Sequence, residues 1–189
     1  MKIIMIEGAR NVGKTHLINN IAAKIPTYKF PFAKFYNECF VQNYNDTPEN
    51  INSKKELFYL TLGYDITILD LAKQGLLKEN IIVDRGILTN LVFGIQSGRI
   101  TEKEAKIAWE YLLFEYSGFF EVVYIKSDNK EDTRNKDMWS LYNKEETEKL
   151  YRIFLTDMKI SDLDPIIIKN NFDEESVKNF NASINMINN

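Results

Sequence analysis

The stretch Gly8-Ala9-Arg10-Asn11-Val12-Gly13-Lys14-Thr15 follows directly on a short apolar run near the amino terminus. It fits the pattern G-x-x-x-x-G-K-[ST] at every fixed position. At average residue frequencies, such a match arises by chance in a chain of this length only about one time in a hundred. We therefore predict a phosphate-binding loop here, rather than a glycine-containing turn with an exposed lysine.

The residues on either side of this stretch support the prediction. Lys2–Glu7 (KIIMIE) is apolar enough for a strand buried on both faces, and Gly13–Ile25 has helical apolar spacing up to Pro26. In a strand–loop–helix arrangement, successive backbone N–H groups surround a phosphate. The loop is thus expected to bind ATP, with Lys14 reaching the β- and γ-phosphates and Thr15 offering its hydroxyl to Mg2+.

The rest of the chain alternates strand and helix patterns without an internal repeat. Further strands are predicted at Thr27–Phe35, Asn80–Asp84, Glu121–Lys126 and Pro165–Lys169, and a polar loop at Tyr36–Ser53. Helices are predicted at Lys54–Gln74, Ile87–Gln96, Thr101–Tyr116, Lys144–Lys159 and from Asp173 onward. Such alternation implies right-handed crossovers. We expect one domain over residues 1–189, a three-layer α/β fold whose five-stranded parallel sheet carries helices on both faces.

An acid and a base, Asp84 and Arg85, end the third predicted strand. In open α/β sheets, ligands bind at the carboxyl ends of the strands. There Asp84 could hold Mg2+ or accept a proton from an attacking hydroxyl, and Arg85 could face the acceptor. The alternative is a salt bridge at the strand end.

A charged segment without apolar periodicity follows the fourth predicted strand. It contains Lys130, Arg134 and Lys136 within about residues 127–139. The segment is either a solvated loop or a short lid that brings a cation to the transferred phosphoryl group. Arg134 is the candidate for that role.

Composition excludes several classes of protein. Lys and Arg number 24 against 27 Asp and Glu in 189 residues, a net charge of -3, which argues against a nucleic-acid-coating protein. The single cysteine, Cys39, excludes an internal disulfide framework and a multi-thiolate metal site, and the single histidine, His16, is interpreted as an ordinary helix residue. No apolar run is long enough to span a membrane, so a cytoplasmic protein is expected.

The order of these residues resembles the thymidylate kinase and deoxynucleoside kinase group of P-loop kinases. The matching residues are Ile6-Glu7-Gly8, Phe30-Pro31, Asp84-Arg85 with Thr89 five residues after the acid, Phe93-Gly94 and Gly98-Arg99. The resemblance implies an ATP-dependent kinase, a possible homodimer and an acceptor pocket. That pocket would be lined by Phe30, Pro31, Lys34, Tyr64, Asp65, Arg85, Thr89, Phe93 and Arg99.

Two departures from the family pattern concern the acceptor. Ala33 stands where thymidylate kinases usually carry an arginine, and Gly63-Tyr64-Asp65 stands in place of their A-D-R. The leading hypothesis is phosphoryl transfer to a deoxynucleoside monophosphate. The alternative is a kinase that acts on a deoxynucleoside or on a DNA or RNA hydroxyl, and nucleic acid would then be bound only as an acceptor. The third hypothesis is a P-loop NTPase that is not a kinase.

Overall fold

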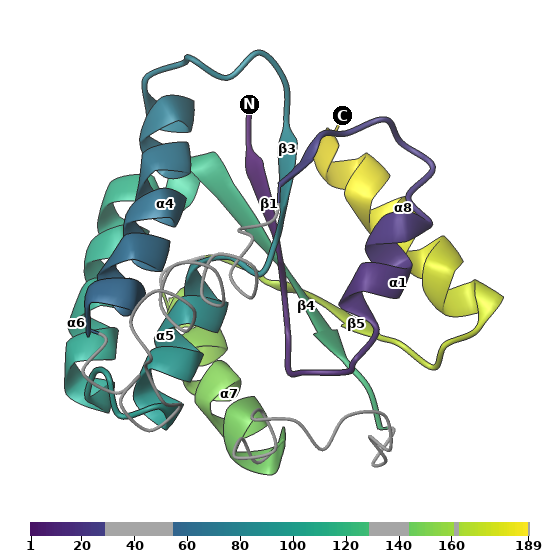
Figure 1. The fold of residues 1–189 in the computed structure, drawn as a ribbon. Helices are drawn as coiled ribbons and strands as arrows, with labels where there is room; N and C mark the ends of the chain where they lie inside the picture. The colour runs from purple at the N-terminus through teal and green to yellow at the C-terminus, as the bar shows by residue number, and fades with distance from the viewer. Residues whose placement is uncertain (29–54, 129–143, 161–162, 189) are drawn as a thin grey trace, which may run out of the picture.

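The computed structural model describes residues 1–28, 55–128, 144–160 and 163–188, as an α/β fold (Figure 1). The strands are β1 (Ile3–Glu7), β2 (Thr27–Tyr28), β3 (Ile81–Asp84), β4 (Phe120–Lys126) and β5 (Ile166–Lys169). The helices are α1 (Lys14–Asn19), α4 (Lys55–Lys73), α5 (Ile87–Gln96), α6 (Glu102–Tyr116), α7 (Lys144–Ile160) and α8 (Glu174–Asn188). Most of these bounds lie within a residue or two of the predicted ones.

The strands form a single five-stranded sheet in the order β2-β3-β1-β4-β5. Every neighbouring pair is parallel, and β1 lies in the centre, with Ile3 opposite both Ile81 of β3 and Phe120 of β4. Because β1 is hydrogen-bonded on both edges, it needs the continuous apolar run seen in its sequence. The predicted fold class is confirmed.

Alternate residues of the central strands face opposite sides of the sheet, because side chains in a strand alternate with period two. Ile3 and Met5 join a core shared with α4, α5, α6 and α7, whereas Ile4 and Ile6 join a second core shared with α1 and α8. Figure 1 shows these two groups of helices on either side of the sheet. The same alternation places Glu7 on the α5 side.

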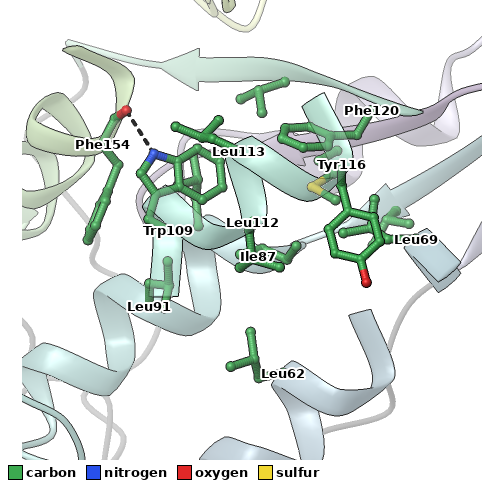
Figure 2. Close-up of a cluster of buried hydrophobic side chains, with 14 of the residues drawn as sticks. Leu62, Leu69, Ile87, Leu91, Trp109, Leu112, Leu113, Tyr116, Phe120 and Phe154 are labelled. Atoms are coloured by element: carbon green, nitrogen blue, oxygen red, sulfur yellow. Dashed lines mark hydrogen bonds between the residues drawn. The ribbon is translucent and has the colours of Figure 1, made fainter. Parts of the chain in front are cut away.

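The larger core is organised around Trp109 of α6, whose side chain is fully buried (Figure 2). Its indole N–H donates to the carbonyl of Phe154 in α7 at 3.2 Å, and its ring packs edge-on against the Phe154 ring and beside Phe120 of β4. The tryptophan therefore joins α6, α7 and the sheet. Its replacement by alanine would cost about 3–5 kcal/mol.

Helix α6 begins as its sequence predicts. The Thr101 hydroxyl accepts from the backbone N–H of Glu104 at 3.2 Å, and the Glu104 carboxylate accepts from the N–H of Thr101 at 2.7 Å. These reciprocal bonds form the capping box that Thr101-x-x-Glu104 indicates.

The first helix is shorter than predicted, because α1 ends at Asn19 and does not continue to Ile25. The reason is a tertiary contact with α8. The Asn181 side chain accepts from the N–H of Ala22 at 2.7 Å and donates to the carbonyl of Asn20 at 3.0 Å. These bonds satisfy backbone groups that would otherwise continue the helix.

The predicted second strand can be compared only at its start, since β2 covers Thr27–Tyr28 and residues 29–54 lie outside the described part. Among the described residues, no helix has the length and apolar character needed to cross a membrane.

Candidate active site

The glycines of the phosphate-loop motif hold backbone conformations that other residues rarely adopt. Gly8 has φ 140°, and a Cβ there would lie 2.2 Å from the carbonyl oxygen of Ile125. Gly13 has φ 83°, and Asn11 between them has φ 61°, which asparagine tolerates better than most residues. The motif spacing therefore reflects real backbone constraints.

Lys14 is folded back across the loop and is only 4% exposed. Its ammonium group donates to the carbonyl oxygens of Gly8 at 2.7 Å and Ala9 at 2.5 Å. The cation is thus held on the loop itself. Thr15, the next residue, is exposed.

The turn between β5 and α8 packs against the phosphate loop. The Asn170 side chain is fully buried and donates to the carbonyl of Val12 at 2.8 Å. A Cβ at Gly13 would lie 2.2 Å from the Asn170 amide nitrogen and 2.7 Å from the Phe172 ring. The sequence analysis missed this contact, which no local pattern around Asn170 signals.

Asp84 and Arg85 end β3 directly beside the strand that leads into the phosphate loop. Asp84 is opposite Ile6 in the register, and its side chain is buried. By strand alternation it shares the α1 side of the sheet with Ile82, the side on which the phosphate loop continues. The predicted adjacency of acid and loop strand is present.

Arg85 occupies a left-handed backbone conformation, with φ 72°. Its backbone N–H donates to the carbonyl of Ile6 at 3.1 Å, and its guanidinium carbon lies 5.9 Å from the centre of the Phe93 ring in α5. Left-handed non-glycine residues are costly and cluster at functional sites. The partly exposed guanidinium therefore stands on a constrained turn next to α5.

Glu7 is a buried acid of this site to which the sequence analysis assigned no role. Its carboxylate is 0% exposed and accepts from the N–H of Leu88 at 3.1 Å, the N–H of Thr89 at 3.1 Å and the Thr89 hydroxyl at 2.5 Å. Burial raises the pKa of Glu7 to about 7, against the opposing effect of these bonds and of Lys14. The signal that could have revealed Glu7 is its place on the Ile3–Met5 face of β1.

Helices α4 and α5 bring together part of the predicted acceptor pocket. The Asn90 side chain donates to the Asp65 carboxylate at 2.5 Å. Burial, with the nearby Glu7 charge, raises the pKa of Asp65 well above its usual value. Burial and the charges of Asp65 and Tyr28 raise the pKa of Tyr64. Tyr64 and Asp65 thus lie near β2 and the start of α5.

Two other predicted pocket residues are Thr89, which belongs to α5, and Arg99, which follows that helix. The Thr89 hydroxyl is occupied by Glu7 and by the hydroxyl of Tyr151 in α7 at 2.8 Å. Arg99 is buried and follows the carboxyl end of α5, a helix about 15 Å long, whereas Arg85 precedes its amino end. The place of Arg99 at the edge of the acceptor pocket stays a prediction.

Several predicted site residues lie outside the described part of the chain. The undescribed segment 29–54 contains the predicted pocket residues Phe30, Pro31 and Lys34. The undescribed segment 129–143 contains the lid candidates Lys130, Arg134 and Lys136. Their roles remain predictions.

The residues predicted to hold Mg2+ fit that ion chemically. Thr15 offers a hydroxyl and Asp84 a carboxylate, both oxygen ligands on adjacent segments. In phosphoryl-transfer sites Mg2+ keeps several waters and is bound through one or two protein oxygens plus the substrate phosphates. The lack of any cluster of three His, Cys, Asp or Glu ligands within the described residues is therefore compatible with such a site.

Solved structures with the same fold include a nucleotide kinase and a nucleoside kinase. A thymidylate kinase from Ehrlichia chaffeensis is similar over 98% of this chain and 97% of its own, with TM-score 0.60 and 12% identity. A deoxyadenosine kinase from M. mycoides, solved with bound dATP, is similar over the whole of both chains, with TM-score 0.59 and 17% identity.

A third similar structure is that of NadR protein in complex with NR, with TM-score 0.62 and 14% identity. The match covers 99% of this chain, which spans half the length of that protein. No family model matches the sequence, and no curated protein matches it. At these identities, the comparisons establish that the chain has the P-loop kinase fold.

Proposed function

We propose that the chain is an ATP-dependent phosphotransferase that acts on a nucleoside or nucleotide. The observation that carries the proposal is the alignment of the phosphate loop with Asp84 and Arg85 at the ends of the adjacent strands β1 and β3. This places a donor-phosphate cradle beside an acid and a base. The kinases that share the fold support the same reading.

In this proposal each residue has a definable task. The loop binds the phosphates of ATP through backbone N–H groups, and Lys14 neutralises charge at the β- and γ-phosphates as the transfer proceeds. Thr15 and Asp84 would hold Mg2+, which supplies charge neutralisation at the phosphates. Arg85 faces the acceptor, and Arg134 would bring a further cation when the site closes.

The leading acceptor is a deoxynucleoside monophosphate, bound between β2, α4 and α5. A base would stack on the aromatic rings of Tyr64, Phe93 and the second-strand residue Phe30. Arg85 would bind the acceptor phosphate. Base–aromatic stacking contributes about 1–3 kcal/mol per base.

A deoxynucleoside is the second candidate, and the electrostatics of the described pocket favour it specifically. Glu7 and Asp65 are two buried carboxyl groups on the acceptor side, and the charge of Glu7 is one of the causes that raise the pKa of Asp65. A phosphate dianion could approach these groups only if both were held in their protonated forms, whereas a sugar hydroxyl could bond to Asp65 in either form.

The test is transfer of labelled phosphate from ATP to nucleosides, their monophosphates and 5′-hydroxyl DNA. A monophosphate with kcat/KM above that of its nucleoside supports the leading acceptor, and the reverse order supports the second. ATP hydrolysis without transfer to any acceptor would contradict the proposal and favour a non-kinase NTPase.

The possible homodimer has a candidate surface on α6. Three large apolar side chains recur at helical spacing on this helix and are exposed: Ile107 by 58%, Tyr111 by 58% and Phe114 by 84%. Lys103 and Glu110 extend the same stripe with opposite charges. We propose that a second copy packs antiparallel on this stripe, so that Ile107 of each copy lies near Phe114 of the other and Tyr111 lies near the centre.

A further inference from the structure

The most constrained polar group outside the assigned tasks is the carboxylate of Glu7. It emerges from β1 immediately before the phosphate loop and is buried beneath the turn that connects β3 to α5. Gly86 lies against it, since a Cβ on Gly86 would be 3.2 Å from a Glu7 carboxylate oxygen and 3.0 Å from Met5. The turn therefore rests directly on the β1 side chains.

Two consecutive residues of β1 hold the two ends of this turn. The Ile6 carbonyl accepts from the backbone N–H of Arg85. The Glu7 carboxylate accepts from the N–H groups of Leu88 and Thr89, in the first turn of α5. These are N–H groups without partners inside their own helix, so Glu7 acts as its amino-terminal cap from a distant strand.

The conformation of Arg85 needs such support. A left-handed φ is unfavourable for arginine and persists only where the surrounding structure enforces it. If the Glu7 bonds were lost, α5 would be released at its first turn, and Arg85 could relax to an ordinary conformation. Its guanidinium would then leave its place beside Phe93.

The same carboxylate also connects the turn to α7. The Thr89 hydroxyl donates to Glu7, so the Tyr151 hydroxyl must be the donor to Thr89. The chain of bonds runs from α7 through α5 to the strand that carries the phosphate loop.

We propose that Glu7 is a positioning residue, which fixes the Arg85 turn and the start of α5 in register with the phosphate loop. The inference rests on the proposed function for its kinetic consequence alone, because the structural consequence can be measured without any acceptor. Glu7 contacts neither reactant in this scheme and acts through Arg85.

The experiment compares three variants of the full chain. Glu7→Gln replaces one acceptor oxygen by a donor, and Glu7→Asp keeps the charge but withdraws the carboxylate by one methylene. Glu104→Gln is the matched control, since Glu104 is also a carboxylate that caps a helix, at the start of α6. The readouts are amide hydrogen exchange at Leu88 and Thr89, the Kd for ATP, and kcat/KM for the acceptor.

Both Glu7 variants are expected to lose protection at the two amides and to lower kcat/KM for the acceptor by about tenfold or more. The Kd for ATP should change by less than about twofold, and Glu104→Gln should leave all three readouts as in the wild type. Should Glu7→Gln not fold, Glu7→Asp carries the comparison.

Unchanged exchange at Leu88 and Thr89 in Glu7→Asp would overturn the proposal, as would an equal loss of ATP affinity and acceptor turnover. If the wild type transfers phosphate to no acceptor, the proposed function fails, while the exchange measurement still decides whether Glu7 holds the turn.

Discussion

Replacing Gly13 by alanine should separate a tertiary contact from a purely conformational cost. Gly13 has φ 83°, and its added Cβ would lie 2.2 Å from the Asn170 amide nitrogen and 2.7 Å from the Phe172 ring. Gly75 has φ 70° with nothing within 4 Å of an added Cβ. Gly75→Ala is therefore the matched control, with the same backbone strain and no steric conflict.

The magnitudes follow from these two environments. A left-handed alanine costs about 1–2 kcal/mol, of which about 0.4–1 kcal/mol is offset by the lower entropy of the unfolded chain. Gly75→Ala should thus lose about 1.6 kcal/mol at most. Gly13→Ala must also displace buried Asn170 from the Val12 carbonyl, which adds about 0.5–1.5 kcal/mol for the hydrogen bond and further strain.

Urea unfolding of both variants gives the difference directly, and ATP titration shows whether the loop itself has moved. We expect Gly13→Ala to be less stable than Gly75→Ala by about 1–3 kcal/mol and to bind ATP more weakly. Equal destabilisation of the two variants, with unchanged ATP affinity, would refute the claim that the β5–α8 turn holds the phosphate loop in place.

Four other outcomes are expected. Lys14→Met keeps most of the apolar stem and removes the ammonium, so turnover should fall at least about a hundredfold. Thermal unfolding should show some loss of stability, because the carbonyls of Gly8 and Ala9 lose their buried donor. Near-normal phosphate transfer would exclude the assigned role. Asp84→Asn should lower kcat far more than it weakens ATP binding in a titration, and a parallel loss of both would place Asp84 in donor binding only. Glu7 has a pKa of about 7 in the folded protein against an ordinary value of 4.5, so the folded protein binds this proton more tightly than the unfolded chain. The unfolding free energy should therefore fall as the pH rises from about 4.5 through 7. In urea unfolding across this range, Glu7→Gln should flatten that slope, and an unaltered slope would contradict the raised pKa. In sedimentation, Phe114→Asp and Ile107→Asp should each weaken self-association, whereas Met186→Asp on exposed α8 should have no effect. A monomeric wild type would rule out the α6 interface.

The structural features that the sequence predicts correctly are those that follow from local residue patterns. The glycine-containing loop between β1 and α1, the apolar strands and the capping box of Thr101 depend on residues close together in the chain. The placement of Asp84 beside the loop strand follows from parallel topology, which crossover rules restrict to few arrangements.

What could not be predicted depends on contacts between distant segments. The end of α1 is determined by Asn181 in α8, and the shape of the phosphate loop is supported by Asn170. The role of Glu7 depends on α5 N–H groups some eighty residues further along the chain. The alternation along β1 indicates that Glu7 is buried on the Ile3–Met5 face, but neither it nor the asparagines indicate which distant groups are the partners.

The central place of β1 has a consequence for how this chain acquires its structure. A ribosome releases β1 before either neighbour, yet residue 3 pairs with residues 81 and 120. The strand β1, which has the highest apolar content, therefore stays unpaired on both edges until β3 and β4 have been synthesised. Long-range parallel pairing is also slow to form. During synthesis, the segment around Ile3–Ile6 is thus the part of the chain most in need of protection from other nascent chains.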